Sequence, residues 1–347
     1  MNREPLLGKT IDELKAVAGE LGIPSYSAGQ IADWLYRKNI SSVDNMTNLS
    51  KQTRNKLAEK YETGLISYSK VMESSDGTKK YLFPTRPGKF VEAAFIPETR
   101  RNTLCLSTQV GCKMGCLFCY TGMQGFQGNL TAGEIINQLL SIPEREKITN
   151  LVFMGMGEPF DNLKELMKSL EILTAEYGLG MSPRRITVST IGIIPGMREF
   201  LNNSNCHLAV SLHSPFEEER KYLMPVENVY SLGQVIDELK SYDIGRQRRI
   251  SFEYIMFKDM NDTPRHVREL VSLLGGIRCR INLIRFHAIP GVPLQSSDNI
   301  KMEQFKEALN KKGLFTTIRQ SRGEDIYAAC GMLSTKSLVK EDKEKDY

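Results

Sequence analysis

The sequence lacks any long hydrophobic run. No stretch approaches the roughly 18 apolar residues that a membrane-spanning helix needs. The first ten residues, MNREPLLGKT, carry charges and no apolar core, so they do not match a secretory signal peptide. These two absences make the cytoplasm the simplest expected location, with no membrane partner.

The sequence also lacks an even number of cysteines that could all pair in disulfides. An odd number in a long chain without a signal peptide argues against the disulfide framework of a secreted protein. Three of them fall within one short stretch, and this clustering indicates metal or redox chemistry instead. The seven are Cys105, Cys112, Cys116, Cys119, Cys206, Cys279 and Cys330.

Composition and charge are ordinary, and no internal repeat is present. The 347 residues are 41% hydrophobic and 25% charged, which is typical of a globular protein with a sizeable core. This length predicts one large domain and a small one. The net charge of +5 is compatible with an anionic partner but does not require one.

The first part of the chain predicts helices followed by antiparallel strands. Residues 1–65 form an expected helical accessory domain, in which Thr10 with Glu13 and Ser27 with Gln30 have capping-box spacing. A third helix is expected near 51–61. In residues 66–98, an antiparallel β extension is indicated by turns at Asp76-Gly77 and Pro87-Gly88. Six basic residues, which could track phosphates, are Lys51, Arg54, Lys56, Lys60, Lys79 and Lys80.

Residues 99–335 alternate predicted strands with predicted helices. Such alternation means parallel strands with right-handed crossovers, and six units make an incomplete (β/α)6 barrel in an α/β fold. Residues 336–347 mix charges without periodicity and are expected to be disordered. The strands are expected at 103–109, 149–155, 185–190, 206–212, 250–257 and 279–286, with a last one at 314–319. The helices are expected near 131–141, 162–176, 195–202, 231–242, 263–274 and 301–312, the first capped by Thr131 with Glu134.

The strongest signal is a set of three closely spaced cysteines, Cys112, Cys116 and Cys119, just after the first strand of the α/β region. Three thiolates on a short loop can each bind one iron of a 4Fe-4S cluster and leave the fourth iron open. An open iron can chelate S-adenosylmethionine and deliver an electron to its sulfonium. The alternative is a structural zinc site, which normally takes two pairs of ligands, and the sequence has no second pair.

These motifs resemble the radical S-adenosylmethionine superfamily and, within it, the bacterial adenine-C2 methyltransferases of rRNA and tRNA and their C8-methylating resistance relatives. The resemblance covers about residues 5–335 and implies an RNA methyltransferase on a partial barrel. It rests on the stretches FVEAAFIPE, TLCLSTQVGC, FMGMGEP, ITVSTIGIIPG, LAVSLHSP, RINLIRFHAIPG and GEDIYAACG.

The resemblance implies a cofactor site at the carboxyl ends of the strands. Gly157 and Glu158 would contact the methionine amino group of S-adenosylmethionine, although the glycine alone could be only a tight turn. His287 stands where many relatives have Asn. His213 alone would by default be a satisfied core histidine. The remaining residues expected to line the cofactor site are Ser189, Ser211 and Leu212.

The resemblance also implies a relay between two distant cysteines. Cys330 would be methylated by one S-adenosylmethionine, and a second molecule would yield the radical that activates this methyl group for addition to the base. Cys105 would then attack Cys330, forming a transient disulfide and releasing the RNA. Glu92 would accept the proton from the base carbon, although by itself it resembles an exposed strand carboxylate. Cys206 and Cys279 match no functional position and are expected to be buried small hydrophobes.

The expected partners are 23S rRNA, tRNA modified beside the anticodon, and an external electron donor, for a chain expected to be a monomer. Possible RNA contacts are Arg54, Arg246, Arg248 and Arg249. The expected reaction is methylation at adenine C2, and the nearest alternative is methylation at C8 of 23S rRNA. A zinc-stabilised RNA-binding protein and a radical enzyme acting on a small molecule are two hypotheses from other classes.

Overall fold

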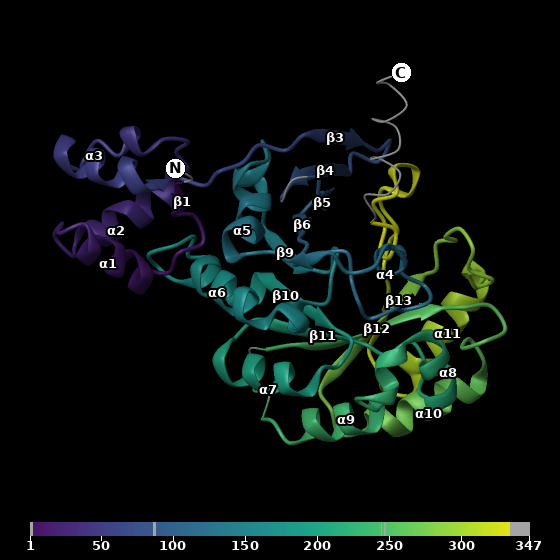
Figure 1. Cartoon of the computed structure of the whole chain (residues 1–347). Helices are drawn as coiled ribbons and strands as arrows, with labels where there is room; N and C mark the ends of the chain where they lie inside the picture. The colour runs from purple at the N-terminus through teal and green to yellow at the C-terminus, as the bar shows by residue number, and fades with distance from the viewer. Residues whose placement is uncertain (1–2, 86–87, 244, 246–247, 334–347) are drawn as a thin grey trace.

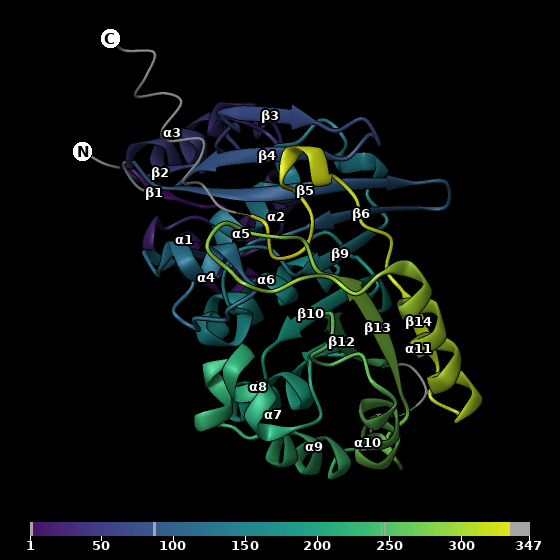
Figure 2. The same cartoon turned by 90° about the vertical axis from the view of Figure 1, so that its right-hand side faces the viewer.

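A ten-stranded sheet forms the centre of the molecule (Figures 1 and 2). The computed structural model describes residues 3–85, 88–243, 245 and 248–333. Seven strands, from β6 to β14, are parallel, and β3, β4 and β5 continue the same sheet in antiparallel pairing. In spatial order the strands are β14 (Thr316–Ile318), β13 (Cys279–Arg285), β12 (Ile250–Met256), β11 (His207–Ser211), β10 (Ile186–Thr190), β9 (Asn150–Phe153), β6 (Arg101–Cys105), β5 (Phe90–Glu98), β4 (Lys79–Pro84) and β3 (Lys70–Glu73).

Amphipathic helices cover one face of this sheet. Inward side chains of alternate strand residues, such as Leu104, Phe153 and Phe252, are fully buried against them. This strand–helix alternation confirms the expected α/β fold class. The helices that follow the parallel strands are α5 (Ala132–Leu140), α6 (Leu163–Thr174), α7 (Ile194–Asn203), α9 (Leu232–Lys240), α10 (Pro264–Leu274) and α11 (Asn299–Lys311), with the short helices α4 (Tyr120–Gln124) and α8 (Glu217–Leu223) between them.

The N-terminal segment is helical, as predicted, and its ends meet in a small parallel pair of strands. It contains β1 (Glu4–Pro5), α1 (Ile11–Glu20), α2 (Ser27–Ala32) continued by a π-helical turn (Asp33–Arg37), α3 (Lys51–Lys60) and β2 (Tyr61–Glu62). The Thr10–Glu13 capping box is present, as is the one formed by Thr131 and Glu134 at α5.

The predicted capping box of Ser27 and Gln30 is wrong. Tyr26 already has helical dihedral angles, and the N–H of Ser27 donates to the carbonyl of Pro24 at 2.9 Å. Ser27 therefore lies inside the helix, and its side chain is buried and caps nothing.

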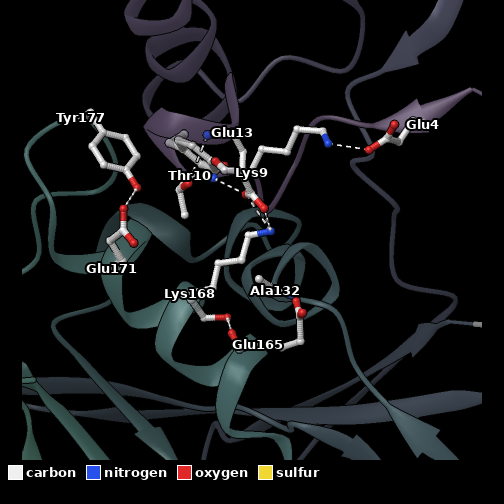
Figure 3. Close-up of polar contacts among 11 residues, drawn as sticks. Glu4, Lys9, Thr10, Glu13, Ala132, Glu165, Lys168, Glu171 and Tyr177 are labelled. Atoms are coloured by element: carbon white, nitrogen blue, oxygen red, sulfur yellow. Dashed lines mark hydrogen bonds and ion pairs between the residues drawn. The ribbon is translucent and has the colours of Figure 1, made fainter. Parts of the chain in front are cut away.

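The N-terminal helices share a hydrophobic core with α5 and α6. Ile136 and Ile172 are fully buried against residues of α1, α2 and α3. Polar contacts close the same boundary, where Lys168 of α6 forms an ion pair with Glu13 of α1 at 2.7 Å (Figure 3). Nearby, Glu165 accepts a hydrogen bond at 2.8 Å from the backbone N–H of Ala132, at the start of α5. The shared core and the Lys168–Glu13 ion pair hold the N-terminal helices against α5 and α6, and the Glu165 bond joins α6 to α5.

One predicted strand is too long. The strand expected at 103–109 ends at Cys105, and Gln109–Val110 forms a separate strand, β7, paired with β8 (Gly128–Asn129). The chain leaves the main sheet because Ser107 bonds elsewhere: its hydroxyl donates to the carbonyl of Glu92 at 2.6 Å and accepts from the N–H of Met156 at 2.8 Å. The other predicted strands and helices of this region agree with the structure to within about two residues.

Three sequence predictions fall on residues outside the described ranges: the tail 336–347, Pro87 and Arg246. Within the described ranges, no helix is both long enough and apolar enough to cross a membrane.

Candidate active site

The second face of the parallel sheet is polar and lines a cavity of about 500 Å³. Successive residues of a strand point to opposite faces, so the residues beside the buried Leu104 and Phe252 point into this cavity. Thr103, Cys105 and Glu253 are three of them. The sheet thus separates an apolar core from a polar chamber.

The three clustered cysteines lie on the loop that follows β7. Cys112 and Cys116 are buried and Cys119 is half-buried, and burial raises the pKa of all three thiols, that of Cys112 to about 12. Gly111 begins this loop at φ +71°, and a Cβ there would overlap the carbonyl oxygen of Gly125, so the tight path requires glycine. Buried thiols become thiolates when a metal cation replaces their protons.

The surroundings of these thiols suit an iron–sulfur cluster. Cys116 packs in an apolar group with Phe118 and Phe257, which keeps water away from the loop. Within the described ranges, no group of three His, Cys, Asp or Glu residues is arranged to hold a single metal ion. A four-iron cluster makes a different demand, because each thiolate binds a separate iron.

Gly157 and Glu158 lie just after β9, where the chain turns tightly. Gly157 has φ +99°, and a Cβ there would overlap the side chain of Gln109. Glu158 is buried and accepts hydrogen bonds from the Thr190 hydroxyl at 2.7 Å and from the N–H of Ile191 at 3.1 Å. Burial outweighs these bonds and raises the pKa of Glu158 to about 7. A buried carboxyl of this kind gains from a cationic partner.

The other residues expected around the cofactor divide into two groups. Ser189 and Ser211 lie half-buried on the polar face, at the carboxyl ends of β10 and β11. Leu212 is fully buried in the core. His213 is also buried: its Nδ1 accepts from the N–H of Ile255 at 3.0 Å, and burial lowers its pKa to about 3.

The ring of His213 packs edge-to-face on Phe118 of the cysteine loop, with 4.6 Å between ring centroids. His287 lies apart from this group, among the residues that line the cavity, where the Ser321 hydroxyl and its Nε2 are 3.0 Å apart. The structure therefore places His213 behind the cysteine loop and His287 in the polar chamber.

Cys105 and Cys330, which are far apart in the sequence, line the same cavity. Cys105 ends β6 and is buried, and this burial raises its pKa to about 12, whereas Cys330 is exposed. Of the two remaining cysteines, Cys206 is buried and Cys279 is half-buried, away from this pair. The chain thus brings together the two cysteines that the resemblance singles out.

The loop that carries Cys330 is held by the hairpin of β3 and β4, beside which it lies in Figure 2. The Ser74 hydroxyl donates to Asp325 at 2.6 Å, and the N–H of Gly323 donates to Asp76 at 3.0 Å. On its other side the loop reaches the cysteine motif, because the N–H of Tyr120 donates to the carbonyl of Gly331 at 2.8 Å. The hairpin and the start of α4 together fix Cys330 near the cluster loop.

Glu92 is fully buried on β5, so the alternative of an exposed strand carboxylate is wrong. It forms an ion pair at 3.2 Å with Lys80, which is itself 4% exposed. Lys80 is therefore not part of a basic surface, although the sequence suggested one. Its ammonium also donates to the carbonyl of Tyr327 at 3.4 Å, in the loop that carries Cys330. This contact links the Glu92 ion pair to the Cys330 loop.

Sequence reasoning missed Arg319, a half-buried arginine that lines the cavity. Its guanidinium donates to Glu253 at 3.3 Å and contacts the sulfur of Met154 at 3.2 Å. Burial opposes its charge, but the two thiols of Cys105 and Cys330 and the Glu253 carboxylate raise its pKa above the ordinary value. No local pattern marks Arg319, because its partners come from strands far away in the sequence.

The suggested RNA contacts have different surroundings. Arg54 is half-buried and directs its guanidinium at the carbonyl of Leu49 at 3.4 Å, and Arg248 bonds the carbonyl of Leu201 at 2.9 Å. Arg249 lines the cavity. Of these three, Arg249 alone faces the polar chamber.

Comparisons with known proteins agree with this site. Residues 106–274 match the Radical SAM superfamily, and residues 5–63 match the ribosomal RNA large subunit methyltransferase N-terminal domain. The chain is 57% identical to the "Probable dual-specificity RNA methyltransferase RlmN" of Parabacteroides distasonis, covering 98% of this chain and 99% of the relative. It is 41% identical to the "Dual-specificity RNA methyltransferase RlmN" of Syntrophus aciditrophicus, covering 97% and 98%.

A solved structure is also similar over nearly the whole chain. The radical SAM methyltransferase of Sphaerobacter thermophilus is 37% identical and superposes with a TM-score of 0.89, covering 95% of this chain and 99% of that one. Together with the three-cysteine loop and the polar chamber, these matches place the chain within the radical SAM superfamily, in the RlmN family of dual-specificity RNA methyltransferases.

Proposed function

We propose that this protein methylates C2 of a specific adenine in 23S rRNA and of the adenine beside the anticodon in tRNA, through a methyl group carried on Cys330. The observation that carries the proposal is the shared cavity of Cys105 and Cys330 beside the cysteine loop. The C2 carbon of adenine is electrophilic, so direct methyl transfer from a sulfonium does not work, and a cysteine relay solves this problem. These substrates would place the reaction in the cytoplasm.

Cys112, Cys116 and Cys119 would hold three irons of a 4Fe-4S cluster and leave one iron open. When bound, the cluster and S-adenosylmethionine supply reductive cleavage of the cofactor, with electrons from an external donor. Glu158 would accept the cofactor's amino group, because its buried carboxyl gains from a cation. The rest of the cofactor site would comprise Gly157, Ser189, Ser211, Leu212, His213 and His287.

Three side chains of this protein would each carry out one step of the reaction. Cys330, the exposed thiol, would receive a methyl group from one S-adenosylmethionine, and a second molecule would be used in each turnover. Glu92 would accept the proton that leaves the base carbon. The Cys105 thiolate would then attack the sulfur of Cys330, so that a disulfide forms as the sulfur–carbon bond to the RNA breaks; the bonding pair would leave with the carbon, which takes up a proton to become the methyl group.

The RNA side of the proposal rests on the N-terminal helices. We propose that residues 1–65 form an RNA-binding accessory domain, that the β strands of 66–98 extend the sheet toward the Cys330 loop, and that residues 99–335 form the catalytic partial barrel. The protein would act as a monomer. The target base must leave its stack to reach the chamber, as in other enzymes that modify bases.

Nucleoside analysis tests the proposed reaction. Purified protein loaded with its cluster under anaerobic conditions is incubated with unmodified rRNA and tRNA, and the digested RNA is analysed by mass spectrometry against standards. The expected product is 2-methyladenosine in both RNAs. The appearance of 8-methyladenosine would favour the alternative, and a colourless protein that binds zinc without modifying RNA would overturn the proposal.

A further inference from the structure

Four arginines gather at one end of the polar chamber, opposite the end where Cys105 lies. Arg101 begins β6, Arg184 closely precedes β10, Arg249 directly precedes β12, and Arg280 is the second residue of β13. Because neighbouring parallel strands start at the same edge of a sheet, these positions come together at the amino ends of the strands. His207, the first residue of β11, lies among them.

These arginines are short of negative partners. Six arginines but only two glutamates line the cavity. One of these, Glu253, already accepts from Arg319 and, at 2.7 Å, from the side chain of Asn282. Among the described residues, none of the four guanidinium groups at this end has a carboxylate within 4.0 Å.

The pKa values of these groups reflect their surroundings. Burial lowers the pKa of Arg101, which Glu98 opposes and Arg319 and Arg249 reinforce. Burial and then Arg249 lower the pKa of Arg280, which Glu253 opposes. Burial first, and then Arg249, lower the pKa of His207 to about 4, so this histidine is neutral at pH 7. Its Nδ1 accepts from the N–H of Arg249 at 3.1 Å, which places the proton on Nε2 as a donor. An uncompensated group of this kind attracts an anion.

We propose that Arg101, Arg184, Arg249 and Arg280 bind phosphates of the single-stranded RNA segment that flanks the target adenine. This inference rests on the proposed function. The planar guanidinium group of an arginine can donate two hydrogen bonds to the oxygens of one phosphate. Four such groups at one end of the cavity therefore suit an RNA backbone with several phosphates.

The dimensions of the cavity favour a strand over an isolated base. Arg101 and Cys105 are four residues apart on β6, which corresponds to about 13 Å along a strand. A ligand that contacts both ends is therefore longer than one adenine. Because the chamber has a cavity of about 500 Å³ and carries the four arginines at one end, a splayed loop fits it better than a duplex.

A matched pair of double variants tests the proposal. Arg249→Gln with Arg280→Gln removes two of the four guanidinium groups that line the cavity. The control, Arg185→Gln with Arg278→Gln, removes two exposed neighbours that do not line the cavity. Each protein carries its iron–sulfur cluster, and the probe is a fluorescent RNA stem–loop with the target adenine in its loop. Fluorescence anisotropy gives the Kd over a series of salt concentrations.

The variant with Arg249→Gln and Arg280→Gln is expected to bind the stem–loop roughly tenfold more weakly at low salt. Its plot of log Kd against log salt should be shallower by about 0.7 for each phosphate that the variant no longer binds. The control variant should change both quantities much less. The single variant Arg249→Gln gives the same comparison with Arg185→Gln if the double variant does not fold.

Two outcomes would overturn the inference. Equal losses in the two double variants would mean a general basic surface. The other outcome is unchanged RNA binding, with methylation lost under a protein reductant but kept under a chemical one. It would mean that the four arginines bind an acidic electron-donor protein instead. The proposed function is tested separately: wild-type protein that binds the stem–loop through these arginines but forms no 2-methyladenosine refutes the reaction and keeps the phosphate site.

Discussion

The two cysteine sets of this molecule are assembled in different ways. Cys112, Cys116 and Cys119 lie within one loop, so short-range geometry brings them together. Cys105 and Cys330 lie at the two ends of the α/β region and line one cavity because the β3–β4 hairpin and the start of α4 hold the last loop in place. A local site depends on its own loop, whereas a long-range site depends on every element that positions its partners. Substitutions should therefore affect the two sets differently.

The largest effect is expected within the loop. Replacing any one of Cys112, Cys116 or Cys119 by Ala should abolish cluster, brown colour and methylation together, because three ligands are the minimum for a cluster with one open iron. Iron content, visible absorption and RNA methylation are measured on each variant. Cys206→Ala serves as the control and should keep all three. A loop variant with full iron content and normal methylation would contradict the ligand assignment.

The long-range pair should keep the cluster but fail at separate steps. Cys330→Ala should form neither methylated protein nor an RNA adduct, because it lacks the methyl acceptor. Cys105→Ala should accumulate RNA attached to Cys330, because the resolving thiol is missing. Denaturing electrophoresis with nuclease treatment and mass spectrometry of the peptide containing residue 330 distinguish these results. Similar small losses in both variants would instead indicate packing cysteines and refute the relay.

A smaller effect is expected where the hairpin holds the Cys330 loop. Asp325→Ala removes the acceptor for the Ser74 hydroxyl and for the N–H of Ser75. The loop should become more mobile, and methylation should fall about tenfold while cluster content stays normal. Kinetics and iron analysis are compared with those of Asp298→Ala, a helix cap far from the site. If iron content and activity fall in parallel, the loop is not independent of the cluster.

The smallest effect is a pH dependence of cofactor binding. Burial raises the pKa of Glu158 to about 7, so its carboxyl is ionised above this pH and increasingly neutral below it. A cationic amino group binds the ionised form, so affinity for S-adenosylmethionine should be constant above pH 8 and decline as the pH falls through 7. Calorimetric titration at several pH values measures this. Glu158→Gln should bind more weakly at pH 8 and lose the pH dependence in this range, and an unchanged profile would exclude the assigned contact.

Sequence alone predicted the parts that depend on local order. The cysteine loop, the alternating strands and the capping boxes at Thr10 and Thr131 follow from residue spacing, and the structure contains them. The Ser27–Gln30 capping box failed for a local reason, because the helix already begins before Ser27. The strand that was predicted too long failed because of partners that are distant in the chain. Ser107 ends β6 because it bonds residues on two other segments, and no local signal reports those bonds.

Burial of charge was a further failure. Glu92 and Lys80 look like exposed residues of a hairpin, but β4 and β5 are internal strands of one continuous sheet, and the two side chains are buried against each other. Arg319 is half-buried rather than buried, but its partner Glu253, which is buried, likewise lies on another strand. Whether a charge is buried depends on which strands become neighbours, and that is a property of the topology.

The position of Cys330 in the chain has a consequence for synthesis on the ribosome. The cysteine loop and every strand of the sheet, β14 included, emerge before Asp325 and Cys330, and protein segments generally fold in the order of their synthesis. The hairpin that will hold the last loop is then already present in the sheet. A nascent chain therefore completes the proposed iron-binding loop well before the proposed methyl carrier Cys330, and Cys105 can meet Cys330 only after all strands of the sheet have been synthesised.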